Sequence, residues 1–198
     1  AGIAQHVNDQ PVAVAPILDT AALTSGFAAR NAARGETGLG NYAAYTPDGM
    51  RIEAQPQVVE LSSLIASHAP DGTVNPAYPH AEGIQPRDRS NAASQAQITE
   101  LASRREPDRR QPSPEASTGA PIVNAGNVVE SGNGRVMALN RVYSDPNLQD
   151  QAAAYRAMIA ARGHDIEGRQ QPGLIGRRLS DLSPEDTTRF ARGANERA

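Results

Sequence analysis

The chain has 198 residues, a formal net charge of −3 and 38% hydrophobic residues, of which few are aromatic. This length fits one domain of ordinary size, or one domain with an extension. The net negative charge argues against a protein that binds polyanions over its whole surface, and the absence of cysteine excludes disulfide bonds, thiolate metal sites and a cysteine nucleophile.

All 19 basic residues are arginine. We attribute this to a GC-rich coding sequence, which also fits the abundance of alanine; selection against lysine modification in a protein delivered into another cell is the alternative. No apolar run has the length of a membrane span, and no signal peptide is visible. We therefore expect a cytoplasmic protein without a membrane partner, or one delivered into a host cytoplasm.

The first 56 residues are expected to form an N-terminal extension. Residues 11–18 read as an edge strand or an extended arm, and residues 21–34 as a helix ended by a glycine. The turn sequence Thr46-Pro47-Asp48-Gly49 predicts a β-hairpin over residues 42–54.

Residues 57–198 are expected to form the main domain. Strand and helix patterns alternate along it, which predicts an α/β or α+β fold with a small mixed sheet. Strands are expected at 58–61, 121–123, 127–130 and 173–179, and helices at 90–104, 136–143, 150–162 and from 183 onward. The polar, proline-rich residues 106–118 are expected to form an exposed, mobile insertion.

The most informative stretch is Glu130-Ser131-Gly132-Asn133-Gly134-Arg135, between a predicted strand and a predicted helix. A glycine turn at a helix N-terminus is suited to anions, because backbone N–H groups point outward and the helix dipole favours negative charge. Arg135 adds a guanidinium group that suits phosphate. The stretch predicts phosphate or nucleotide binding, and a purely structural turn is the alternative.

For several other arginines and for the histidines, more than one role remains possible from the sequence. Arg87, in the stretch Gln85-Pro86-Arg87-Asp88-Arg89, reaches a nucleotide or belongs to a surface Arg–Asp cluster. The pairs Arg104-Arg105 and Arg109-Arg110 form a basic patch or part of a solvated loop. The four histidines lack the spacing of a metal site, although His68 and His80 flank one loop.

The order of several motifs resembles the ParB N-terminal domain, most closely the DdrB-like branch of the ParB/sulfiredoxin superfamily. The motifs are Asn75-Pro76, Gln85-Pro86-Arg87, Glu100-Leu101-Ala102, Gly119-Ala120-Pro121-Ile122-Val123 and Gly132-Asn133-Gly134-Arg135. Residues 178–182 and 194–197 look like the later strand and the "EN" segment of that family. Domains of this branch typically sit in large proteins of phages and mobile elements.

The resemblance implies a small α/β fold with a pocket for CTP or ATP and Mg²⁺. Carried over by position, Gly132, Gly134 and Arg135 keep the phosphate role, and the further nucleotide-binding candidates are Gln85, Arg87, Ser131 and Asn133. Asn195 corresponds to the asparagine that helps to hold Mg²⁺, and Glu130 is the candidate carboxylate for the metal and for catalysis.

Three departures from the family pattern limit what the resemblance implies. Asn133 stands where sulfiredoxins have their cysteine, so reduction of a sulfinic acid is excluded. Gly134 replaces a charged residue of the phosphate box, and Ala194 replaces the acid of "EN". One neutral asparagine is a poor ligand for Mg²⁺, which prefers carboxylates.

These observations support three hypotheses. The first is a nucleotide-binding domain of a phage or mobile-element protein, with slow hydrolysis or nucleotide-gated contact with DNA. The second is a metal-dependent, ParB-like DNA nuclease, for which Glu130 and Asn195 are a thin set of ligands. The third is a non-catalytic module that keeps the fold and docks onto other domains or subunits of a larger assembly.

Overall fold

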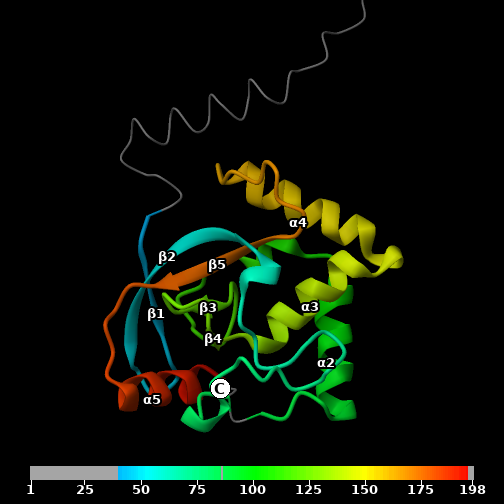
Figure 1. Ribbon diagram of the computed structural model, residues 1–198. Helices are drawn as coiled ribbons and strands as arrows, with labels where there is room; N and C mark the ends of the chain where they lie inside the picture. Colours follow the sequence, from blue (N-terminus) through cyan, green and yellow to red (C-terminus); the bar gives the residue numbers. More distant parts are fainter. Residues whose placement is uncertain (1–39, 86, 196–198) are drawn as a thin grey trace, which may run out of the picture.

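The computed structural model describes residues 40–85 and 87–195, so the arm and helix predicted within the first 39 residues lie outside the described part. One five-stranded mixed sheet has the order β1-β2-β5-β3-β4 (Figure 1). The strands are β1 (Tyr42–Tyr45), β2 (Arg51–Glu60), β3 (Ile122–Val123), β4 (Val129–Ser131) and β5 (Pro172–Arg178). The α-helices are α2 (Ala92–Ser103), α3 (Asn133–Ser144), α4 (Gln149–Ala161) and α5 (Pro184–Asn195). The expected α+β class is confirmed.

The predicted hairpin forms, but it belongs to the same sheet as the rest of the domain. β1 pairs with β2 in antiparallel register, with Tyr45 opposite Arg51. β2 then continues to Glu60 and pairs with β5 from Ala54 to Glu60. The boundary expected between residues 56 and 57 therefore falls inside a strand.

The central strand is β5, which is antiparallel to β2 and parallel to β3. The chain reaches it from β3 through β4, α3 and α4. A Cβ atom at Gly176 would collide with the hydroxyl group of Tyr42, so this glycine leaves room for the Tyr42 side chain over β5.

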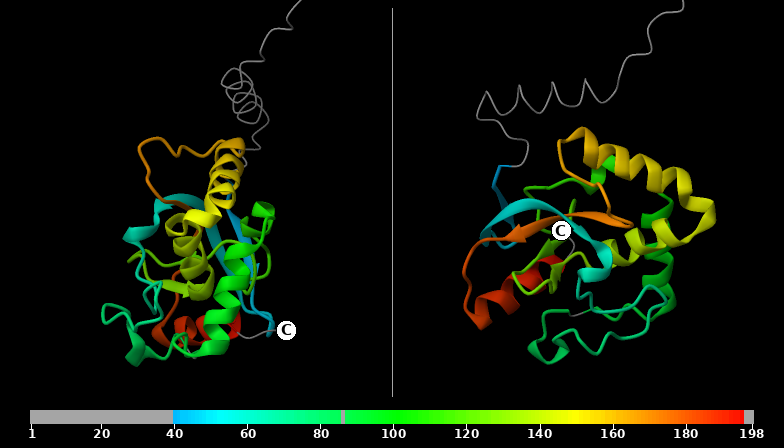
Figure 2. Two further views of the ribbon diagram at one scale, coloured as in Figure 1. Left: turned by 90° about the vertical axis from the view of Figure 1, so that its right-hand side faces the viewer. Right: turned by 45° about the horizontal axis from the view of Figure 1, so that its top comes forward.

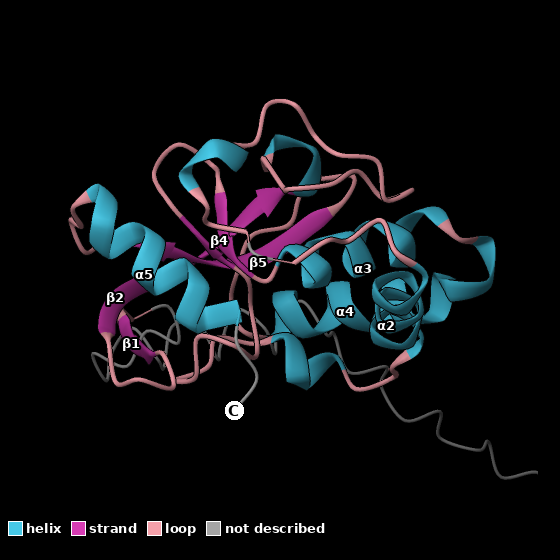
Figure 3. Ribbon diagram, turned by 90° about the horizontal axis from the view of Figure 1, so that it is seen from below, coloured by secondary structure: helices cyan, strands magenta, loops and turns pink. Residues whose placement is uncertain are grey.

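Helices lie on two sides of the strands. α5 lies on one side, and α2, α3 and α4 are grouped on the other (Figure 3). α3 contacts both α2 and α4 (Figure 2). Phe190 of α5 packs on Ile52 of β2 and Ile122 of β3, whereas Leu139 of α3 packs with Leu174 of β5. No helix in the described part of the chain has the length and apolar character needed to cross a bilayer.

Two helix starts show how local sequence sets the element boundaries. The side chain of Asn91 accepts a hydrogen bond from Ser94 N at 2.8 Å, so Asn91 is the N-cap of α2 in place of the expected Ser90. At α5, Ser183 Oγ accepts a hydrogen bond from Asp186 N at 3.1 Å, as its sequence pattern predicts.

The segment 106–118 is not a fully exposed insertion. Pro107–Arg110 forms a 3-10 turn. Further on, Pro114 O accepts a hydrogen bond from Tyr45 N at 2.7 Å, and Ala116 N donates to Tyr45 O at 2.9 Å. Ala116 is fully buried in the cluster below α5. The segment docks here because it satisfies the edge of β1, a tertiary requirement that the polar composition conceals.

Replacing Phe190 with alanine should remove the main apolar contact of α5 with the sheet. Phe190 is fully buried, so we expect a loss of about 3–5 kcal/mol in the free energy of unfolding, measured by urea denaturation. Leu179→Ala is the control, because Leu179 is 46% exposed and its loss should have little effect. Equal losses from the two variants would contradict the packing described here.

Candidate functional site

The turn Gly132–Arg135 joins β4 to α3, as the sequence predicts. Gly132 is the N-cap and has a φ of 90°, in the left-handed region that favours glycine. No side chain caps the first turn of α3, and the first turn holds no acidic residue. The helix end therefore keeps the positive electrostatic character that suits an anion.

The guanidinium of Arg135 folds back and binds backbone carbonyl groups instead of projecting into solvent. Its Nη1 donates to Gly119 O at 2.8 Å and also contacts Thr118 O, and its Nη2 donates to Ala116 O at 3.2 Å. Nη2 also donates to Ser131 Oγ at 2.8 Å. Burial lowers the pKa of Arg135 to about 10. Arg135 thus clamps the segment 116–120 against β4 and α3.

A different arginine lies over the start of α3. Arg89 is 5% exposed, and its Nη1 donates to Gln97 Oε1 at 3.2 Å. A Cβ atom at Gly134 would lie 3.1 Å from the same Nη1, so the absence of a side chain at Gly134 makes room for Arg89. Arg87, the arginine of this loop for which a nucleotide contact or a surface cluster was expected, is partly exposed.

Asn133 is fully buried and has a structural contact on each side of its amide group. Its Oδ1 accepts a hydrogen bond from Ser67 N at 2.7 Å, and its Nδ2 donates to Val129 O at 3.2 Å. Gln85 reaches the same loop, because its Nε2 donates to Ser67 Oγ at 3.3 Å. Asn133 and Gln85 therefore fix the loop around Ser67 next to the turn.

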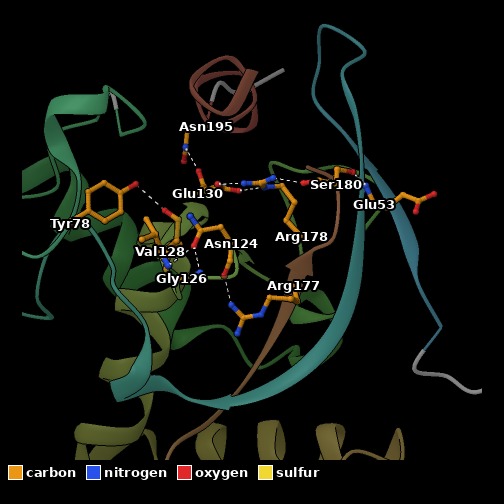
Figure 4. A network of polar contacts seen from close by, with 11 residues as sticks. Glu53, Tyr78, Asn124, Gly126, Val128, Glu130, Arg177, Arg178, Ser180 and Asn195 are labelled. Atoms are coloured by element: carbon orange, nitrogen blue, oxygen red, sulfur yellow. Dashed lines mark hydrogen bonds and ion pairs between the residues drawn. The ribbon is translucent and has the colours of Figure 1, made fainter. Parts of the chain in front are cut away.

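Glu130 is fully buried and forms a bidentate ion pair with Arg178 (Figure 4). Arg178 Nε lies 2.7 Å from Oε2, and Nη2 lies 2.9 Å from Oε1. Such a buried pair satisfies both carboxylate oxygens. The carboxylate that we expected to act in catalysis and metal binding is instead committed to joining β4 to the end of β5.

Asn195 lies beside Glu130, as the resemblance implies, but the contact is with the backbone. Its Nδ2 donates to Glu130 O at 3.2 Å and to Ala191 O at 2.6 Å (Figure 4). Within residues 40–85 and 87–195, no group of three or more His, Asp or Glu residues is placed to hold a metal ion. Glu130 and Asn195 therefore do not fit a Mg²⁺ site.

The loop that carries His68 and His80 brings the two rings together. Their centroids lie 6.1 Å apart, and His68 Nδ1 lies 2.9 Å from Ser67 Oγ. Burial, and then the neighbouring His80, lower the pKa of His68. A neutral His68 at physiological pH is what this environment favours.

A groove borders Arg135 between the C-terminal end of α2, the segment 104–120 and α3. We call it the arginine groove; its lining includes Leu101, Arg104, Glu106, Asp108, Arg109, Arg110, Gly119, Pro121, Arg135, Ala138 and Leu139. Its outer part has a volume of about 430 Å³. This volume falls within the range of small-molecule sites.

Four arginines face two carboxylates in the arginine groove, so its local charge is positive although the whole chain is negative. Arg110 lies 5.7 Å from the ring centroid of Tyr155 and donates to Leu101 O at 2.7 Å. Burial lowers the pKa of Arg110. The sequence left open whether Arg104, Arg109 and Arg110 form a basic patch or part of a solvated loop. In the structure they lie together beside Arg135.

Glu130→Gln should destabilise the fold, because it leaves the charge of Arg178 buried without its partner. We expect a loss of about 3–5 kcal/mol in the free energy of unfolding, measured by urea denaturation. The control is Glu53→Gln, which breaks the exposed pair with Arg51 and should leave stability unchanged. A Glu130→Gln protein of unaltered stability would show that the pair is not structural.

Arg135→Ala should release the segment 116–120 and leave several carbonyl groups without a donor. We expect a loss on the order of 3 kcal/mol in stability. Hydrogen exchange should also accelerate at the amide of Ala116, which is buried in the parent protein. Arg51→Ala is the control, and unchanged exchange at Ala116 in Arg135→Ala would contradict the clamp.

Comparison with known proteins identifies the family. The model of the ddrB-like ParB superfamily domain matches residues 47–179, a range that runs from the β1–β2 turn through β5 and includes the turn Gly132–Arg135. Searches of curated proteins and of solved structures returned no significant match. The family match covers more than half of the chain and confirms the resemblance seen in the motifs: the chain belongs to the family of ddrB-like ParB superfamily domains.

Proposed function

We propose that this domain binds a nucleoside triphosphate, CTP or ATP, with its phosphate groups in the arginine groove. The observation that carries the proposal is the gathering of Arg104, Arg109 and Arg110 beside Arg135 of α3. Guanidinium groups bind phosphate with two parallel hydrogen bonds.

The arginines of the groove can exchange their present carboxylate partners for a phosphate group. Arg104 Nη2 lies 2.8 Å from Glu100 Oε1, and Arg109 Nε lies 3.5 Å from Glu106 Oε2. These pairs are exposed, and such pairs contribute only about 0–1 kcal/mol. A phosphate group with several negative oxygens is a stronger partner than either carboxylate.

The inner, apolar part of the groove has a volume of about 50 Å³, so the base and sugar of a nucleotide would lie mostly in the open outer part. Leu101 and Leu139 face the groove from α2 and α3, and Pro121 closes it from the start of β3. Apolar walls with a few convergent charged groups are the usual composition of a ligand site. The proposal is limited to binding, because Glu130 is committed to Arg178 and gives no support to hydrolysis or DNA cleavage.

The test is calorimetric titration of the 198-residue chain with CTP and with ATP. The double variant Arg104→Ala/Arg109→Ala should bind at least tenfold more weakly, because two charge-assisted hydrogen bonds of about 1.5–3 kcal/mol each are lost. Arg51→Ala is the matched control, since Arg51 is also exposed and paired with a glutamate, but lies on β2.

The control should keep the affinity of the parent protein, and thermal unfolding should show that all variants fold. Absence of heat with either nucleotide would overturn the proposal, as would equal affinity in the double variant.

A second candidate is a non-catalytic interaction module of a larger phage or mobile-element assembly. The observation in its favour is that Glu130, Asn133 and Arg135 all make internal contacts that stabilise the fold. If the chain binds neither nucleotide but forms a complex with neighbouring domains in light-scattering measurements, this candidate replaces the first.

A further inference from the structure

We infer that the arginine groove binds a metal-free polyphosphate chain, whose charge is neutralised by arginine and not by Mg²⁺. The inference rests on the proposed function, since it concerns the form in which the ligand enters the same groove. It departs from the Mg²⁺ that the ParB resemblance implies, and it follows from the donor groups that this chain offers.

The residues that occupy the implied metal positions do not fit Mg²⁺. Mg²⁺ bound with phosphate takes one or two carboxylates from the protein. Both oxygens of Glu130 accept hydrogen bonds from Arg178, and its side chain has no exposed surface. Asn195 is 7% exposed and turns its amide nitrogen toward two backbone carbonyls. Neither supplies a carboxylate to a bound metal.

The two acids that line the groove lie among guanidinium and amide donor groups. Glu106 pairs with Arg109 at 3.5 Å. Asp108 Oδ1 lies 3.5 Å from Arg162 Nη2 and accepts a hydrogen bond from Gln111 Nε2 at 2.6 Å. A divalent cation placed beside them would face several guanidinium groups, and like charges at such distances repel.

The same charges favour the metal-free ligand. The arginines of the lining outnumber its two acids, so the groove has a net positive charge. These arginines are Arg104, Arg109, Arg110 and Arg135. Binding of Mg²⁺ to the phosphate chain cancels part of its negative charge and therefore weakens its attraction to the groove. A short inorganic polyphosphate should bind in the same way, because recognition depends on the phosphate oxygens.

The experiment compares calorimetric titrations of the 198-residue chain with CTP, ATP and inorganic triphosphate, in excess EDTA and in excess Mg²⁺ at matched ionic strength. We expect a Kd in EDTA that is at least threefold lower than the Kd in Mg²⁺. Tighter binding in Mg²⁺ overturns the inference and leaves the proposed function intact. No binding in either buffer overturns both.

A double variant that lacks the groove carboxylates tests the inference independently. Glu106→Gln/Asp108→Asn removes both carboxylates that line the groove among the described residues, and this variant should bind at least as tightly as the parent chain in EDTA and in Mg²⁺. If this variant loses binding only in Mg²⁺, the two acids hold a metal and the inference is wrong. Both side chains are largely exposed, so the variant should fold normally.

Discussion

The contact between Arg135 and the backbone carbonyls of the segment 116–120 is the constraint on which the groove and its surroundings depend. No carboxylate lies among its hydrogen-bond partners in the described residues; Gly119 O, Ala116 O and Ser131 Oγ satisfy the charge instead. Hydrogen bonds from a charged donor contribute about 1.5–3 kcal/mol each. Ser131 Oγ in turn donates to Ala116 O at 2.6 Å, so β4, α3 and the segment are joined at one point.

This clamp gives the glycine turn a different function from the one that its sequence suggests. Gly132 leaves room for the guanidinium to fold back, since a Cβ atom there would lie 2.5 Å from Arg135 Nε. The folded-back Arg135 holds the end of the segment 104–120, and the start of that segment then presents Arg104 and Arg109 to the groove. The turn thus positions one side of the groove in which we propose that phosphate binds.

Much of the fold is predictable from the sequence, because its signals are local. The hairpin around Gly49 follows from turn chemistry, and α5 follows from Ser183 and the acids after it. The boundary expected at residue 56 lies inside β2, because β2 pairs with β5, a partner more than a hundred residues away in sequence. Periodicity within one segment cannot reveal a long-range strand pair.

The candidate site is only partly predictable for the same reason. The sequence singles out Glu130 and Arg135 by type and position, but their partners, Arg178 and the carbonyls of 116–120, are set by tertiary packing. A buried carboxylate beside an arginine is satisfied as an ion pair and leaves no oxygen for a metal. The arginines at 104–110 carry a visible signal, their clustering, but their position beside α3 is set by tertiary contacts such as the hydrogen bond from Arg110 to Leu101 O.

The most direct test of this account is a crystal structure of the chain grown with CTP or ATP in the presence of EDTA. The account predicts phosphate density within hydrogen-bonding distance of Arg104, Arg109 or Arg110, with the pair between Glu130 and Arg178 unbroken. Phosphate density away from the arginine groove, or a Glu130 carboxylate turned toward the ligand, would contradict it.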